Sequence, residues 1–147
     1  MKAILFDLDG TLVDSEPLHL ESEQRLLAEQ GISFTQEEKT NYVGLSTETI
    51  IRSLIEERGL RGELEQLVAK KTEYYLELVR EKLQVFPQMK PFLARLREAN
   101  IPMAIASGSS LKIIHAVLEA TQLKHSFAVV TSAEEVAKGK PAPDVFL

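Results

Sequence analysis

Residues 2–11, KAILFDLDGT, carry the pattern that decides the fold of this chain. The apolar run at 2–6 is typical of a short buried strand, and the Asp/Gly-rich residues after it indicate a loop. In an extended loop Asp7 and Asp9 can flank one reacting group, and Gly10 permits a close backbone approach. One carboxylate can then act as a nucleophile and the other as a general acid and base. An ordinary turn after a strand is the alternative, while Leu18 at the twelfth position disfavours a calcium loop.

Residues 15–82 show helical patterns and no convincing strand. Helices are expected at about 15–30, after a capping box at 35–38, from Ser46 to Gly59, and at about 62–82. Ser15 is a candidate cap for the first of these helices.

Strand patterns return after residue 82. Apolar runs at 102–106 and 127–131 predict two further strands, and helices are expected at about 88–99 and 111–121. This alternation predicts an α/β fold with a parallel sheet. Residues 15–82 would form an inserted helical domain, so that the core consists of 1–14 and 83–147.

The composition restricts the class of protein. The 147 residues include 17 basic and 22 acidic side chains, which give a net charge of −5, and no cysteine. These properties argue against nucleic acid as a partner and exclude disulfides and thiolate metal sites. No stretch approaches the ~20 apolar residues of a membrane helix, and no signal peptide is evident. We expect a cytoplasmic monomer or weak homo-oligomer. Because the net charge is negative, any site that binds a phosphate would need local positive charge from a lysine and a divalent cation.

Two further polar clusters follow predicted strands. The hydroxyl of Ser107 and the backbone N–H of Gly108 suit a phosphoryl oxygen beside a helix N-terminus, although an N-cap serine is the alternative. Lys140, in the sequence KPAPD at 140–144, would neutralise both a carboxylate and a phosphate, although a solvated lysine is the alternative and Lys138 competes. Ligands of such sheets bind beyond the carboxyl ends of the strands, where Asp7, Ser107 and Lys140 fall.

In this order and spacing the three clusters resemble motifs I, II and III of the haloacid dehalogenase superfamily, over essentially the whole chain. Residues 12–16, LVDSE, and the helical insertion resemble the subgroup with a C1-type cap. That subgroup includes β-phosphoglucomutase, phosphoglycolate phosphatase and sugar-phosphate phosphatases. The resemblance implies a Rossmann-like parallel-sheet core with an inserted α-helical cap. It also implies a Mg²⁺-dependent phosphatase that hydrolyses a small phosphorylated metabolite through an aspartyl-phosphate.

The resemblance assigns a role to each motif residue. Asp7 would be the nucleophile, Asp9 the general acid and base, and Lys140 a catalytic residue that orients Asp7. The phosphate would contact loop and strand-end residues from all three motifs, namely Asp7, Leu8, Gly10, Ser107, Gly108 and Lys140. Mg²⁺ would be held by the Asp7 carboxylate and the Asp9 backbone carbonyl.

Substrate choice is expected to lie in the cap. His19 matches a cap-hinge histidine of β-phosphoglucomutase, with a surface or packing role as the alternative. Gly44, in the sequence VGLS at 43–46, resembles the loop that determines substrate specificity. Thr47 stands where the mutase has an arginine that grips a second phosphate, which favours a phosphatase over a phosphosugar mutase. Lys70 or Lys71 is a further candidate, with a solvated charge as the alternative.

The family has a fourth motif, an acidic pair on a later strand that completes the Mg²⁺ site. The chain ends at Leu147 before such a strand, so the resemblance implies a core truncated before motif IV. A catalytically inactive fragment that keeps the phosphate cradle is therefore an alternative to the active phosphatase.

Overall fold

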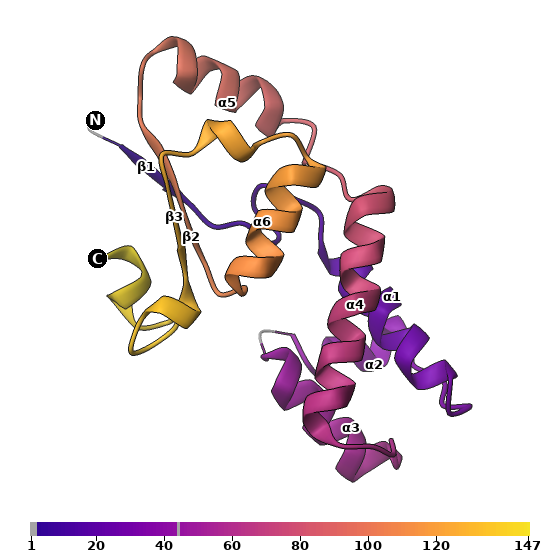
Figure 1. The fold of residues 1–147 in the computed structure, drawn as a ribbon. Coiled ribbons are helices and arrows are strands. Elements are labelled where there is room, and N and C mark those ends of the chain that lie inside the picture. The colour runs from indigo at the N-terminus through magenta and orange to yellow at the C-terminus, as the bar shows by residue number, and fades with distance from the viewer. Residues whose placement is uncertain (1–2, 44) are drawn as a thin grey trace. The chain divides into compact units, whose positions relative to one another are not determined.

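The computed structural model describes residues 3–43 and 45–147, which form two compact units. The α/β unit comprises Met1–Glu16 and Val79–Leu147, and the helical unit comprises Pro17–Leu78. Figure 1 follows the chain from the first strand through the helical unit and back into the α/β unit. None of the helices in the described part of the chain is long and apolar enough to cross a membrane.

The α/β unit contains a three-stranded parallel sheet with the order β1-β2-β3. Its strands are β1 (Ile4–Phe6), β2 (Met103–Ser107) and β3 (Val129–Ser132). The predicted α/β class with a parallel sheet is therefore confirmed. Strand β2 begins one residue later than predicted because Pro102 has no backbone N–H to donate to the ladder, although its carbonyl accepts from Ile4 N at 3.0 Å.

Helices pack on this sheet through apolar faces. They are α5 (Met89–Glu98) and α6 (Leu111–Ala120), followed by three single 3₁₀ turns, η1 (Lys124–Ser126), η2 (Ala133–Glu135) and η3 (Pro143–Phe146). The Phe6 ring lies edge-on to the rings of Phe92 and Phe127, with centroids 6.1 and 6.0 Å apart. Phe6 and Phe127 are buried, and so are further apolar residues of the unit that include Leu8, Leu12, Val13, Leu93, Leu96, Ile105, Ile114, Val117 and Leu118. This core fixes the strand ends from which the polar loops emerge.

The helical unit lies between strands β1 and β2 in the sequence. Its helices are α1 (Glu16–Ala28), α2 (Gln36–Thr40), α3 (Thr47–Arg58) and α4 (Leu64–Lys82), and the unit boundaries fall in the first turn of α1 and the last turn of α4. The predicted capping box of Thr35 and Glu38 is present at the start of α2. Ser46 caps α3, and Gly59 ends it with a left-handed φ of 69°. The apolar cluster comprises Leu26, Leu27, Phe34, Ile50, Ile51, Leu54, Leu60 and Leu67.

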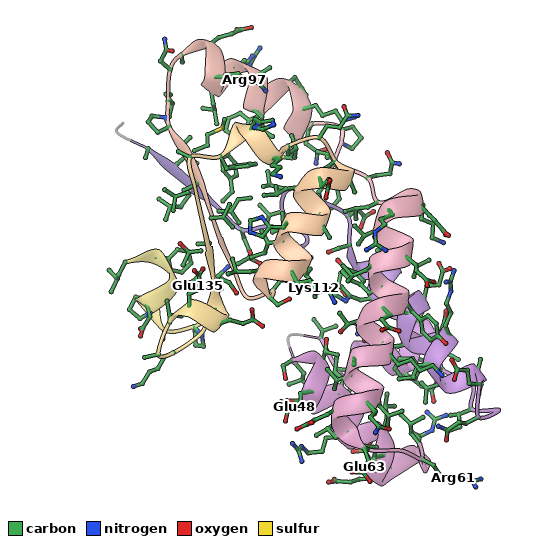
Figure 2. All side chains as sticks on the ribbon, viewed as in Figure 1. Glu48, Arg61, Glu63, Arg97, Lys112 and Glu135 are labelled. Atoms are coloured by element: carbon green, nitrogen blue, oxygen red, sulfur yellow. The ribbon has the colours of Figure 1, made fainter. Side chains whose placement is uncertain are left out.

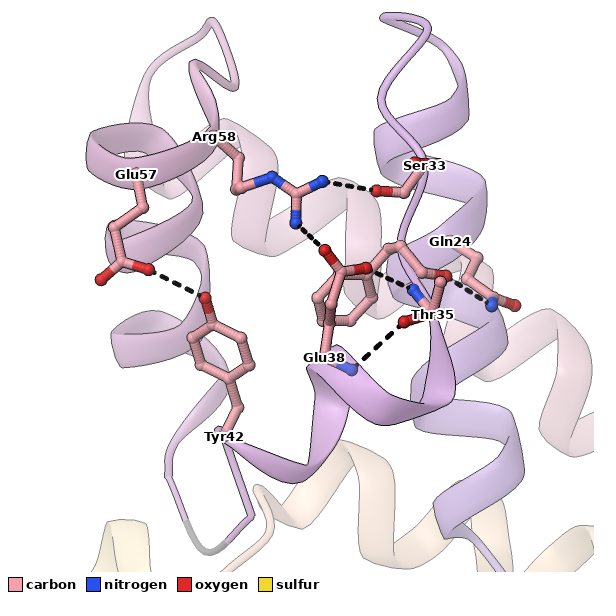
Figure 3. Close-up of polar contacts among 8 residues, drawn as sticks. Gln24, Ser33, Thr35, Glu38, Tyr42, Glu57 and Arg58 are labelled. Carbon is pink, nitrogen blue, oxygen red and sulfur yellow. Dashed lines mark hydrogen bonds and ion pairs between the residues drawn. The ribbon is translucent and has the colours of Figure 1, made fainter.

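Polar contacts join the segment around α2 to its neighbours (Figure 3). Arg58 pairs with the Glu38 carboxylate and donates to the Ser33 carbonyl at 2.9 Å. The hydrogen bond from the Thr35 backbone N–H and the pairing with Arg58 hold the pKa of Glu38 below its usual value. Gln24 of α1 donates to the Phe34 carbonyl at 2.8 Å. These contacts tie a five-residue helix, which would not be stable alone, to α1 and α3.

Candidate active site

The loop after β1 is folded back tightly on the Leu8 carbonyl. That oxygen accepts hydrogen bonds from the N–H groups of Thr11, Leu12 and Val13 at 3.3, 2.9 and 3.3 Å. Gly10 has a φ of 69°, and among the described residues no heavy atom beyond the glycine and its two chain neighbours lies within 4 Å of the position that a β-carbon would take. The glycine is thus needed for its backbone conformation rather than for lack of space. Leu8 is fully buried beneath this turn, so the loop is anchored by packing as well as by hydrogen bonds.

Asp7 is the first residue after β1, and its carboxylate pairs with Lys140. The Lys140 Nζ lies 2.9 Å from Oδ1 of Asp7, and the Leu8 backbone N–H donates to the same oxygen at 2.8 Å. Both of these contacts are to Oδ1, and the Asp7 side chain is 45% exposed. One carboxylate oxygen is therefore held by two contacts, and the side chain as a whole is partly open to solvent. A partly exposed ion pair of this kind contributes little to stability. Its importance therefore lies in the chemistry that a carboxylate beside an ammonium group can perform.

The Asp9 carboxylate accepts hydrogen bonds from two serine hydroxyls. Ser15 Oγ donates to Oδ1 at 2.7 Å, and Ser109 Oγ donates to Oδ2 at 2.7 Å. The sequence suggested Ser15 only as a helix cap, whereas its fully buried hydroxyl contacts Asp9. Both carboxylate oxygens thus accept hydrogen bonds, as in the ionised carboxylate. The ionised carboxylate is the form of the side chain that can receive a proton.

The loop after β2 lies beside these carboxylates. Ser107 pairs in register with Ser132 of β3, and its Oγ accepts from the Ser109 backbone N–H at 3.0 Å. This leaves the Ser107 hydroxyl hydrogen able to donate, although the residue is only 1% exposed. Gly108 is exposed between the two serines, directly before the capped N-terminus of α6. The loop therefore presents small polar groups at the carboxyl end of the sheet.

The loop after β3 is fixed by its own capping box. Ser132 Oγ accepts from the Glu134 N–H at 3.1 Å, and Glu135 accepts from the Ser132 N–H at 3.0 Å. Figure 2 shows Glu135 in this turn. Ser132 Oγ also donates to the Ser109 carbonyl at 2.7 Å, so the ends of β2 and β3 are joined. The sequence interpretation missed Ser109, Ser132 and this use of Ser15. The signal in the sequence that could have revealed these serines is their position, since each lies close to the end of a segment predicted for the core.

The cap candidates belong to the helical unit. The His19 ring is stacked on Tyr75, with centroids 4.1 Å apart, and its Nδ1 lies 2.9 Å from the Lys71 Nζ. Lys71 and Tyr75 are buried. Lys70, the other lysine considered, pairs with Glu29 at the surface. Gly44 lies outside the described residues.

The oxygen donors near Asp7 suit a hard divalent cation with few protein ligands. The part of the chain that the structure describes contains no group of three or more His, Cys, Asp or Glu residues able to hold a metal. Mg²⁺, however, is commonly bound by one or two protein oxygens together with water and substrate phosphate. The half-exposed Asp7 carboxylate fits that mode, whereas the Asp9 carboxylate already receives two hydroxyl donors.

Comparison with known proteins shows the family of the chain. The family model of the haloacid dehalogenase-like hydrolases matches residues 4–147. The chain belongs to this family. Its relatives include fructose-1-phosphate phosphatase YqaB of Escherichia coli, 29% identical over 144 residues, which cover 98% of the chain and 76% of that protein. Hexitol phosphatase B of Escherichia coli is 29% identical over 147 residues, which cover 99% of the chain and 66% of that protein.

Solved structures of the family share the fold. CbbY from Rhodobacter sphaeroides, in complex with phosphate, superposes with a TM-score of 0.82 at 28% identity, over 99% of the chain and 69% of CbbY. The chain thus spans about two thirds to three quarters of the length of these haloacid dehalogenase-like proteins.

Proposed function

We propose that this protein is a phosphatase that hydrolyses a small phosphate monoester, such as a sugar phosphate, through a phosphorylated Asp7. The observation that carries the proposal is the Asp7–Lys140 pair, which holds Oδ1 of a carboxylate whose side chain is 45% exposed. The two phosphatase relatives support the substrate class, since one is a fructose-1-phosphate phosphatase and the other a hexitol phosphatase.

The first step forms a bond between Oδ2 of Asp7 and phosphorus, while the bond from phosphorus to the ester oxygen breaks. Asp9, in its protonated form, gives its proton to the leaving alcohol. Lys140 balances charge that would otherwise make the carboxylate and the phosphate repel each other. Ser107 and Gly108, with the loop residues Leu8 and Gly10, would contact the phosphoryl oxygens.

In the second step a water oxygen bonds to phosphorus and the bond to Asp7 breaks. Asp9 takes the proton of that water, so that inorganic phosphate leaves and both carboxylates return to their starting forms. The two hydroxyl donors on Asp9 suit this stage, because they favour the carboxylate that accepts the proton. Positioning and charge stabilisation would supply most of the rate enhancement.

Mg²⁺ is the cofactor that the donor set suits. The Asp7 carboxylate and the Asp9 backbone carbonyl would hold it, and when bound it would stabilise negative charge on the phosphoryl group. We further propose that residues 17–78 form a cap in which His19 and the loop containing Gly44 contribute to substrate choice. The insertion of these residues directly after the Asp7 loop supports this assignment.

The proposal is tested by phosphate release from fructose 1-phosphate, a hexitol phosphate and phosphoglycolate, with Mg²⁺ and with EDTA. Asp7→Asn should abolish release, whereas Asp14→Asn is the matched control, because Asp14 is an exposed acid of the same segment. Asp9→Asn should lower the rate by about 10²–10⁴-fold, the usual contribution of general acid–base catalysis. Release that survives Asp7→Asn would refute Asp7 as the nucleophile.

A further inference from the structure

Ser109 lies in the loop after β2, and its hydroxyl donates a hydrogen bond to the Asp9 carboxylate. We propose that Ser109 is a positioning residue that orients Asp9 for proton transfer, and that Ser132 holds Ser109 in place. This inference rests on the proposed phosphatase function. It assigns a role to two serines that the reaction steps above do not use.

The backbone of Ser109 is fixed on both sides. Its N–H donates to Ser107 Oγ at 3.0 Å, and its carbonyl accepts from Ser132 Oγ at 2.7 Å. Both partners are buried, with exposed fractions of 1% for Ser107 and 0% for Ser132. Buried hydroxyls seldom exchange such partners for water. The Ser109 hydroxyl is therefore presented to Asp9 from a rigid support built on two strand ends.

The orientation of Asp9 depends on having a donor for each oxygen. The terminal torsion of an aspartate is soft and broad, so hydrogen bonds to its two oxygens set the orientation of the carboxylate. Ser15 and Ser109 donate from two segments far apart in the sequence, one to each oxygen, both at 2.7 Å. Loss of one donor should let the carboxylate turn away from the leaving oxygen. Small misplacements of a reacting group have large effects on rate.

The neighbouring Ser110 provides a matched control, because its hydroxyl has a different task. It caps α6 by accepting from the Ile113 N–H at 3.3 Å. Removal of that hydroxyl should weaken the helix start without disturbing Asp9. Comparison of Ser109→Ala with Ser110→Ala thus separates positioning from general stability within one loop.

The kinetic test compares two esters that differ in their need for a proton. The alkoxide leaving group of fructose 1-phosphate requires protonation, whereas p-nitrophenolate leaves without it. Ser109→Ala should lower kcat/KM for fructose 1-phosphate about tenfold or more relative to kcat/KM for p-nitrophenyl phosphate, because kcat/KM covers only the steps up to release of the alcohol. Ser109→Thr should restore kcat/KM, and Ser110→Ala should leave the ratio of the two kcat/KM values unchanged. Equal losses of kcat/KM on both esters would overturn the proposal.

A spectroscopic test does not depend on turnover. The carboxyl ¹³C resonance of Asp9, assigned by its loss in Asp9→Asn, should shift in Ser109→Ala, shift in the same sense in Ser132→Ala, and return in Ser109→Thr. An unmoved resonance in folded Ser109→Ala would overturn the role of Ser109 whatever the activity. If Asp7→Asn retains activity while the Asp9 resonance behaves as expected, the proposed mechanism fails and the contact stands. If Asp7→Asn is inactive but Ser109→Ala changes neither readout, only this inference fails.

Discussion

Lys39→Met should strongly destabilise the helical unit, because it leaves a carboxylate buried without its cation. Glu23 of α1 and Lys39 of α2 have side chains only 1% and 7% exposed, and their charged atoms lie 2.6 Å apart. Oε2 of Glu23 is buried and has no hydrogen-bond partner among the described residues, so Lys39 carries the compensation. Breaking a buried pair from one side costs about 3–5 kcal/mol. That is a large share of the ~5–15 kcal/mol that stabilises a typical domain.

Urea denaturation followed by tyrosine fluorescence measures this change in the relevant unit. The chain has three tyrosines and no tryptophan, and Tyr42, Tyr74 and Tyr75 all lie in the helical unit. Lys70→Met is the matched control, because it removes a cation from a pair with Glu29 that is 45% and 37% exposed, where the effect should be much smaller. Glu23→Leu combined with Lys39→Met should recover most of the loss, since an apolar pair replaces the buried charges. The reasoning fails if Lys39→Met and Lys70→Met unfold alike, or if the double variant is as unstable as Lys39→Met.

Three further predictions concern the helical unit. Thr35→Ala removes the hydroxyl that accepts from Glu38 N at 3.2 Å, and should lower the free energy of unfolding by about 1 kcal/mol in the same urea assay; an unchanged midpoint would contradict the capping role. Gly59→Ala forces a side chain into a φ of 69° and should cost about 1 kcal/mol, whereas a stabilised variant would show that this helix end is not strained. The hydrogen bond from Lys70 holds the pKa of Glu29 below its usual 4.5, and the hydrogen bond from the Thr35 N–H is the main cause that lowers the pKa of Glu38. The two carboxylates therefore stabilise the folded unit fully above pH 4.5, and this stabilisation is lost as the pH falls through their lowered pKa values. Acid titration of tyrosine fluorescence should show this loss, and Glu29→Gln with Glu38→Gln should flatten it relative to the parent chain.

The sequence predicted the fold and the meeting of Asp7 with Lys140 for a general physical reason. Parallel strands place their carboxyl ends at one edge of the sheet, so polar residues that follow different strands converge without any knowledge of the loops. The apolar runs located β1, β2 and β3 to within about two residues. Burial explains the continuous hydrophobic pattern of β2, the central strand of the described sheet, whereas Leu5 of β1 and Val129 of β3 are about half exposed. The capping box of Thr35 and Glu38 was predictable because its spacing is set locally.

The buried charges were not predictable in the same way. Glu23 lies on α1 among residues that include Leu18, Leu26 and Leu27, and Lys39 lies on a helix of only five residues. A glutamate or lysine in a helical pattern is usually solvated, so the pattern alone indicates an exposed face. Only tertiary packing brings the two side chains together and excludes water. The stacking of His19 on Tyr75 is hidden for the same reason, because the two residues lie on different helices.

The roles of Ser107 and Ser109 show where motif reasoning stops. Both serines stand in one strand-to-helix loop and have the same chemistry, so sequence spacing cannot tell which faces a phosphate and which faces a carboxylate. The two serines differ in the hydrogen bonds of the loop backbone. The hydroxyl of the buried Ser132 donates to the Ser109 carbonyl, and the Ser109 N–H donates to Ser107 Oγ. With its backbone held at both groups, Ser109 directs its hydroxyl to Asp9, while Ser107 keeps its own hydrogen to donate. In the proposed mechanism, the acid–base residue Asp9 is therefore positioned by the ends of β2 and β3, although the carboxylate itself follows β1.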